Sequence, residues 1–139
     1  MRVLGIDFGE KRVGLAISDA DGRIATPLAT IQRRSDEDAV AEIARIARQE
    51  EVTALVVGEP RGLDGQRGSA TSRTGAFAAK LSLATGLPCE MVGETLTSVE
   101  AAARLREAGV SPRRRKEIID AVAAQIVLQE ALDRRRGPG

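Results

Sequence analysis

Short apolar runs near the start of the chain predict three successive strands. Residues 3–8 and 12–18 are apolar runs separated by a three-residue turn, a pattern typical of a β-hairpin. Residues 23–31 follow a second polar turn and predict a third strand, in which Pro27 is compatible only with an edge or bulged position. The first part of the chain is therefore expected to form an antiparallel sheet.

Helical spacing replaces the strand pattern after the third strand. Ser35 can cap a helix whose first turn is acidic, and apolar residues recur at helical spacing over residues 39–47. Residues 54–58 form a continuous apolar run, which is typical of a strand buried on both faces. Residues 60–69 are rich in glycine and predict a flexible loop.

Strands and helices alternate in the rest of the chain. Gly86 and Gly109 each follow a helical pattern and predict its end, and Thr97 with Glu100 has the spacing of a capping box. The predicted elements are a helix over 71–85, a strand over 88–94, a helix from 97 to Gly109 and a last helix over 115–135.

This order predicts an α/β fold in a single domain over residues 1–139. Strands joined by helical crossovers pair in parallel, so two parallel strands are expected beside the three antiparallel ones. The expected architecture is a mixed five-stranded sheet flanked by helices.

Composition excludes several kinds of active site. The 139 residues contain no histidine, tryptophan or tyrosine, one cysteine and two phenylalanines. A Ser-His-Asp triad, a histidine zinc site and an internal disulfide are therefore impossible. Carboxylates, hydroxyls, lysines and arginines are left for polar catalysis, and Cys89, in an apolar strand, is interpreted as a core residue.

The sequence offers neither a signal peptide at its N-terminus nor an apolar run of the roughly 20 residues that a membrane span needs. We therefore expect a cytoplasmic protein with no membrane partner.

Net charge is only +1, but the charges are unevenly distributed. Residues 1–99 carry a net charge of −2 and residues 100–139 a net charge of +3. The basic excess consists of Arg113, Arg114, Arg115 and Lys116, followed by Arg134, Arg135 and Arg136. These clusters are either solvated helix ends or contacts for nucleic-acid phosphates.

Three carboxylates occupy positions that favour a functional role. Asp7 lies within the first apolar strand, Glu94 ends the last strand, and Asp120 flanks the apolar stripe of the final helix. Asp120 could instead be a surface residue paired with Lys116 one turn earlier. If the three carboxylates converge, their oxygen atoms suit Mg²⁺ or Mn²⁺, and two such ions can cleave a phosphodiester.

Four segments, in order and spacing, resemble the YqgF/RuvX family. They are GIDFGEKRVGLAISD, VVGEPRGLDGQRG, GETLTSVEA and KEIIDAVAAQIVLQ, and the resemblance covers essentially the whole chain. Members are RuvC-like proteins of the RNase H fold, described as Holliday junction resolvases and as pre-16S ribosomal RNA nucleases. The resemblance implies roles in ribosome biogenesis and rRNA processing, or in DNA recombination and repair.

The resemblance also implies roles for individual residues. Asp7, Glu94 and Asp120 match catalytic metal ligands, and Lys11 and Arg12 match a basic pair that contacts the nucleic-acid backbone. The sequence departs from the family at Gly93 and Thr95, where an aspartate and an arginine are usual. Glu59 replaces a usually apolar residue and is a candidate for an additional metal ligand.

The sequence thus predicts a metal-dependent endonuclease acting on ribosomal RNA precursors or four-way DNA junctions. Symmetrical cleavage of a junction would call for a homodimer. The alternative is a non-catalytic RNA-binding factor in ribosome assembly with a degenerate nuclease site.

Overall fold

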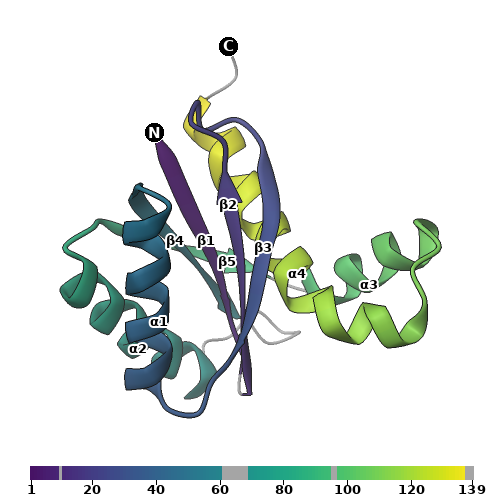
Figure 1. Ribbon diagram of the computed structural model, residues 1–139, viewed down its shortest axis with the longest axis horizontal. Coiled ribbons are helices and arrows are strands. Elements are labelled where there is room, and N and C mark those ends of the chain that lie inside the picture. The colour runs from purple at the N-terminus through teal and green to yellow at the C-terminus, as the bar shows by residue number, and fades with distance from the viewer. Residues whose placement is uncertain (10, 61–68, 95–96, 137–139) are drawn as a thin grey trace.

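Five strands and four helices make up the fold, which we describe from a computed structural model over residues 1–9, 11–60, 69–94 and 97–136 (Figure 1). In chain order the elements are β1 (Arg2–Phe8), β2 (Arg12–Ser18), β3 (Ala25–Gln32), α1 (Asp36–Gln49), β4 (Val52–Pro60), α2 (Ser69–Thr85), β5 (Cys89–Glu94), α3 (Thr97–Glu107) and α4 (Pro112–Arg136).

The strands form one mixed sheet in the order β3-β2-β1-β4-β5. The pairs β1–β2 and β2–β3 are antiparallel, and the pairs β1–β4 and β4–β5 are parallel. Pro27 lies on the edge strand β3, where the register shifts between Leu15 and Ala16 of β2. The predicted sheet is confirmed, and so is the edge position of the proline.

Helix ends follow the local chemistry that the sequence contains. The Ser35 hydroxyl accepts a hydrogen bond from the backbone N–H of Asp38 at 3.1 Å, which confirms the predicted cap of α1. Gly86 and Gly109 follow α2 and α3 with φ angles of 71° and 77°, a left-handed conformation that glycine adopts without steric cost. The predicted capping contact of Thr97 lies outside the described side chains.

Several predicted boundaries were wrong by two or three residues, including both ends of β4 and the start of α2, and hydrogen bonds explain two others. β3 begins at Ala25 because the Asp19 carboxylate accepts hydrogen bonds from the backbone N–H groups of Arg23 and Ile24, at 2.8 and 3.2 Å. α4 begins at Pro112 because the Ser111 hydroxyl accepts from the N–H of Arg114 at 3.3 Å. Proline is favourable in a first helical turn, where its missing N–H has no partner to lose.

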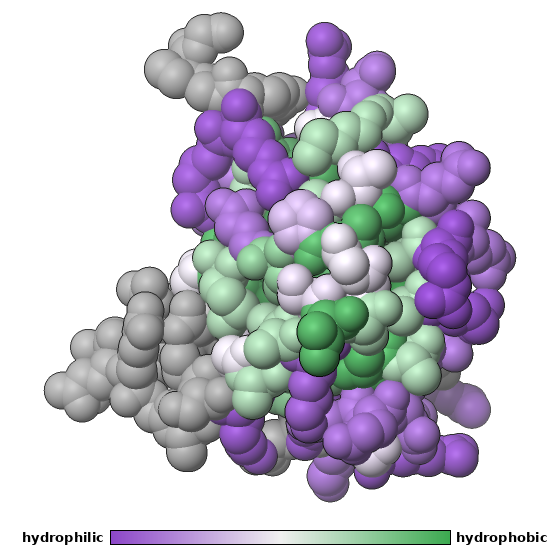
Figure 2. Space-filling view, turned by 90° about the vertical axis from the view of Figure 1, so that its left-hand side faces the viewer, coloured by the Kyte–Doolittle hydropathy of each residue, from purple (hydrophilic) through white to green (hydrophobic). Residues whose placement is uncertain are grey.

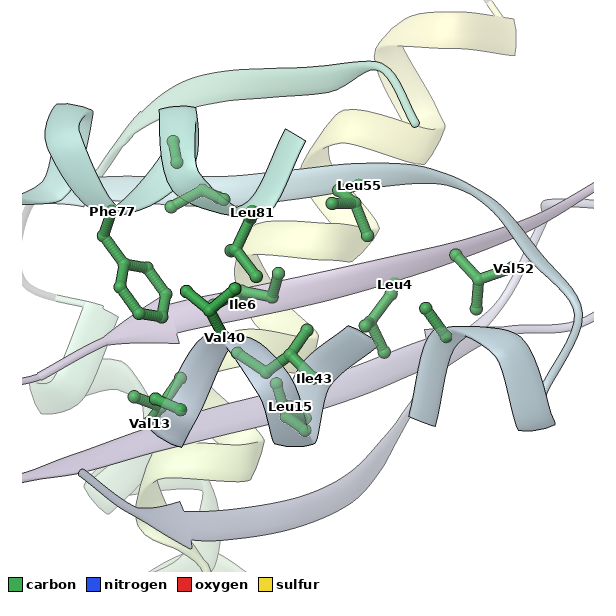
Figure 3. Close-up of a cluster of buried hydrophobic side chains, with 14 residues drawn as sticks. Leu4, Ile6, Val13, Leu15, Val40, Ile43, Val52, Leu55, Phe77 and Leu81 are labelled. Atoms are coloured by element: carbon green, nitrogen blue, oxygen red, sulfur yellow. The ribbon is translucent and has the colours of Figure 1, made fainter. Parts of the chain in front are cut away.

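One face of the sheet is covered by α1 and α2. Figure 3 shows Ile43 of α1 and Phe77 and Leu81 of α2 among the apolar side chains of the strands. These three side chains are fully buried. Leu4 and Ile6 of β1 belong to the same cluster, because side chains two residues apart in a strand lie on the same face of the sheet.

The opposite face of the sheet is covered by α4. Val127, Leu128 and Leu132 pack with Val3 of β1 and Val56 of β4 in a second core. The first part of α4 packs instead with α3, in a separate cluster that includes Ala101, Leu105 and Val122. Figure 1 shows α3 and the start of α4 extending beyond the sheet, and we call α3 with residues 112–119 of α4 the α3–α4 arm.

Two glutamines of α4 bind the backbone at the start of the edge strand. Gln129 accepts a hydrogen bond from the N–H of Ala25 and donates to the carbonyl of Arg23, at 2.9 and 2.8 Å. Gln125 donates to the carbonyl of Ala25 at 2.9 Å. These bonds join the edge strand to the helix.

The outer surface over α1 and α2 has apolar and weakly polar residues at its centre and hydrophilic residues around them (Figure 2). Among the large apolar side chains that the structure describes, Leu83 of α2 is the most exposed, at 89%. Among the described residues, none of the helices combines the length and apolar character needed to cross a bilayer.

Candidate active site

Asp7 lies near the end of the central strand, between glycines on both neighbouring strands. It pairs in register with Gly14 of β2 and with Gly58 of β4. Because Val3 faces α4 and strand side chains alternate, Asp7 is on the α4 face of the sheet. The glycines leave the positions on either side of Asp7 without side chains, and at Gly14 the space is taken by the backbone of α4.

The helix α4 lies very close to the sheet beside Asp7. A Cβ atom on Gly14 would lie 1.9 Å from the carbonyl oxygen of Asp120, so only glycine fits at this position. Gly5 makes a second close approach, since a Cβ there would lie 2.7 Å from the Cβ of Leu128. These glycines bring the Asp120 backbone over β2, next to the strand position of Asp7.

The carboxylate of Asp120 is paired with Arg12, which opens β2. Nε of Arg12 lies 2.7 Å from Oδ2 of Asp120, across 108 positions of sequence. The side chains are 46% and 20% exposed, respectively. The predicted alternative, a surface Asp120 paired with Lys116, is therefore not the arrangement that the described residues form.

A hollow lies over this ion pair. It has a volume of about 320 Å³ and is lined by Gly9, Lys11, Arg12 and Asp120. The structure thus places the two predicted backbone-binding residues, Lys11 and Arg12, beside one of the predicted catalytic carboxylates. Positive and negative groups meet at one opening, as a site for a phosphate and a metal ion requires.

Glu94 ends β5 at the same end of the sheet at which Asp7 lies in β1. Its side chain is outside the described part of the structure. Gly58, the neighbour of Asp7, pairs with Val92, and Glu94 ends β5 two residues farther on, opposite Pro60. Glu59 pairs with Gly93, and its side chain is likewise not described. The predicted roles of Glu94 and Glu59 as metal ligands stay predictions.

No group of three or more acidic, cysteine or histidine side chains gathers for a metal ion among the side chains that the structure describes. The described part of the site supplies two carboxylates, Asp7 and Asp120. Most of the glycine-rich loop predicted over residues 60–69, namely residues 61–68, lies outside the described residues.

The basic residues of α4 lie at opposite ends of the helix. Arg113, Arg114 and Lys116 are exposed in its first turns, and Arg115 is half-buried. Asp120 follows within two turns, whereas Arg134 is 14 residues beyond Asp120, or about 21 Å along the axis. Arg135 pairs with Glu90 of β5 at 3.2 Å. The first cluster therefore borders the site, and the second lies at the far end of α4.

Two further cations, Arg104 and Arg106, were missed by the sequence reasoning. Both are exposed on α3, which packs against the first part of α4 and so lies near the first basic cluster. Their position in the last turn of a helix was the available signal, but that position is also explained by the helix dipole.

Neither the cysteine nor the phenylalanines are placed to act in the site. Burial raises the pKa of the Cys89 thiol to about 11, so it stays protonated near neutral pH, in keeping with its interpretation as a core residue. Phe8 and Phe77 contact each other with ring centroids 4.4 Å apart, and the Arg33 guanidinium covers the Phe8 ring at 4.7 Å.

Two relatives match nearly the whole of this chain. A relative from Chloroflexus aggregans is 46% identical over 136 residues, which are 98% of this chain and 96% of the relative. One from Anaeromyxobacter dehalogenans is 44% identical over 135 residues, covering 97% and 98% of the two chains. Both carry the name "Putative pre-16S rRNA nuclease".

Two solved structures share the fold at low sequence identity. Thermus thermophilus RuvC matches with a TM-score of 0.61 and 20% identity, over 99% of this chain and 97% of that chain. The Holliday junction resolvase of fowlpox virus matches with a TM-score of 0.59 and 13% identity, over 98% and 99%. These matches confirm the RNase H-like fold class predicted from the sequence.

The family described as RuvX, Holliday junction resolvase, matches residues 1–134. That range contains all four segments on which the resemblance was based, as well as Asp7, Arg12, Gly14 and Asp120. The match to nearly the entire sequence, together with relatives above 40% identity, shows that this chain belongs to the RuvX family.

Proposed function

We propose that this protein is a divalent-metal-dependent nuclease that hydrolyses phosphodiester bonds. The observation that carries the proposal is the contact of α4 with β2 at Gly14, which brings Asp120 beside the strand position of Asp7. Two acidic residues from opposite ends of the chain thus occupy neighbouring positions, and the hollow beside Asp120 already accommodates the guanidinium of Arg12.

The residues present fit Mg²⁺ or Mn²⁺. Asp7 and Asp120 offer hard oxygen donors, Glu94 is the proposed third ligand, and Glu59 is a proposed addition in this chain. A pair of such ions supplies an activated water and stabilises the leaving oxygen of a phosphodiester. The protein's own part is to hold the carboxylates together by the close packing of α4 on the sheet.

The cations near the site are proposed to bind the nucleic-acid backbone. Lys11 and Arg12 line the hollow, and Arg113, Arg114, Arg115 and Lys116 begin α4. The phenylalanines contact each other and Arg33, so stacking of bases on aromatic rings is not expected to contribute. Recognition through phosphates predicts affinity that falls strongly with salt.

The proposed substrates are the ribosomal RNA precursor, from the names of the relatives, and four-way DNA junctions, from the family description. Either substrate accords with the cytoplasmic location expected from the sequence. Endonucleolytic cleavage and symmetrical action by a homodimer belong to the junction form of this proposal. The terminal cluster Arg134–Arg136 is proposed to bind phosphates more distant from the cleaved bond.

Replacement of either described carboxylate tests the proposal. Asp7→Asn and Asp120→Asn should each reduce cleavage at least about 100-fold, because each removes a charged metal ligand at nearly constant volume. The measurement is cleavage of end-labelled precursor RNA, single-stranded DNA and four-way junctions with Mg²⁺ or Mn²⁺. Asp21→Asn, in the exposed turn between β2 and β3, is the matched control and should cleave like the wild type.

The outcomes separate the two candidate functions. Wild-type cleavage by the Asp7→Asn variant would contradict the catalytic assignment. The non-catalytic assembly factor would be favoured if the wild type bound every substrate without cleaving it and both carboxylate variants bound equally well.

A further inference from the structure

The ion pair between Arg12 and Asp120 joins two residues with different proposed tasks. Arg12 belongs to the basic pair that would bind a phosphate, whereas Asp120 would hold a metal ion. In the structure the Arg12 guanidinium donates to Oδ2 of Asp120 at 2.7 Å, within the hollow that both residues line. The carboxylate that a divalent cation needs is therefore already engaged by a cation of the protein itself.

We propose that Arg12 exchanges partners when the site is loaded, leaving Asp120 for a phosphate of the nucleic acid once a divalent cation binds the carboxylate. The inference rests on the metal site of the proposed function and assigns Arg12 a role in setting metal affinity. Before loading, the arginine neutralises the carboxylate at the mouth of the hollow. After loading, the same guanidinium is free to form the bidentate contacts with phosphate for which its shape is suited.

The exposure of the pair makes the exchange feasible. Arg12 is 46% exposed at the start of β2, where its long side chain can turn toward solvent while the backbone stays paired with Gln32 of β3. Ion pairs this exposed are weak, so a divalent cation can replace the guanidinium at a cost of about two- to fivefold in affinity. Asp120, at 20% exposure and held over Gly14, stays in place as the common partner.

Exchange of this kind links the two binding events. A divalent cation releases Arg12 for phosphate, and a phosphate that holds Arg12 uncovers Asp120 for the cation. Because linkage is reciprocal, each ligand strengthens the other by the same factor. Arg12 is thus expected to contact the nucleic acid. It is also expected to make the affinity for the metal ion depend on whether nucleic acid is bound.

The first test measures metal binding alone. Titration calorimetry with Mn²⁺ should show that Arg12→Gln binds the ion roughly two- to fivefold more tightly than the wild type, because the competing guanidinium is gone. Lys11→Gln is the matched control, since it removes the same charge from the same hollow without removing the partner of Asp120. Its affinity for Mn²⁺ should change by less than about twofold.

These results distinguish the exchange from its alternatives. If Arg12→Gln and Lys11→Gln gained the same affinity for Mn²⁺, the loss of one positive charge would explain the result, and the exchange would be overturned. An unchanged Kd in Arg12→Gln, with clear binding by the wild type, would overturn the exchange and leave the metal site standing. If no variant binds Mn²⁺, the metal site and the exchange are both wrong.

The second test measures the linkage. Affinity for a labelled precursor-RNA oligonucleotide is determined in EDTA and in Ca²⁺ by fluorescence anisotropy. The gain on adding Ca²⁺ should be smaller in Arg12→Gln than in the wild type, whereas Lys11→Gln should weaken binding in both conditions and keep the gain. The same gain in all three proteins would contradict a role for Arg12 in the coupling.

Discussion

The candidate site depends on a residue without a side chain. Gly14 pairs with Asp7 across the hairpin, and its missing Cβ gives the Asp120 backbone room to lie on β2. Any larger residue would meet a backbone carbonyl of α4, which can move only if the helix moves. The separation between the two carboxylates is therefore set largely by a glycine that performs no chemistry.

Gly14→Ala is expected to damage both stability and activity. The added Cβ would lie 1.9 Å from the Asp120 oxygen, so α4 must shift away from the sheet. We expect a loss of about 2 kcal/mol or more in the free energy of unfolding, measured by urea denaturation, and a fall in cleavage larger than the lost stability explains. The fall arises because Asp120 moves away from Asp7.

Gly75→Ala is the control, because a Cβ there meets nothing within 4 Å. Gly75 lies within α2, where alanine is the better helix former, so this variant should be more stable by roughly 0.5–1 kcal/mol and equally active. If Gly14→Ala matched Gly75→Ala in both stability and activity, neither property would depend on the close approach of α4 to β2.

At the scale of elements, α4 contributes to two packing clusters along its length. Residues 118–126 of α4 contribute to the cluster with α3, and residues 124–132 contribute to the core against the sheet. Asp120 lies in the part that packs with α3, and its backbone also lies against Gly14 of β2. Because the exposed cations of the arm come just before Asp120, this helix connects the proposed catalytic carboxylate to the proposed backbone contacts.

The arm should account for part of the salt dependence of binding. Replacing Arg113, Arg114 and Lys116 by glutamine should lower the slope of log K against log salt by up to about 0.9 per charge on duplex DNA. A triple replacement of Arg34, Arg45 and Arg48, which line a shallow groove between β3 and α1, removes the same charge elsewhere and should change the slope less. Equal slopes in the two triple variants, measured by anisotropy over a salt series, would contradict a specific role for the arm.

Most elements could be predicted because their signals are local. Ser35 caps α1 through a contact three residues away, and Gly86 ends α2 by its own backbone conformation. The contacts of the site are not local. Nothing adjacent to Arg12 indicates that its partner is Asp120, and Gly14 resembles any glycine in a strand until α4 is docked against it. Glu94 was singled out by its place at a strand end, and its participation stays a prediction.

At the scale of the whole molecule, the site joins the two ends of the chain. Asp7 and Arg12 come from the first hairpin and Asp120 from the last helix, so Asp120 comes beside the strand position of Asp7 only when α4 is docked on the sheet. A ligand that binds both carboxylates must therefore stabilise the folded protein against unfolding, because the unfolded chain does not hold them together.

Divalent metal ions should accordingly raise the melting temperature. Ca²⁺ at 100 times its Kd would stabilise the protein by about 2.7 kcal/mol, which corresponds to several degrees in Tm. EDTA should reverse the shift in a thermal denaturation experiment. The shift should be strongly reduced in Asp7→Asn and in Asp120→Asn but retained in Asp21→Asn, and an equal shift in all four proteins would locate the bound ion elsewhere.

The glutamines of α4 have a consequence for self-association. An edge strand presents unpaired backbone groups that invite a neighbouring chain to extend the sheet. At the start of β3, Gln125 and Gln129 already satisfy the N–H and carbonyl of Ala25, and Pro27 brings no N–H to a ladder. The fold thus discourages fibre-like growth at this margin, and a homodimer of this protein is expected to join through a surface other than the start of β3.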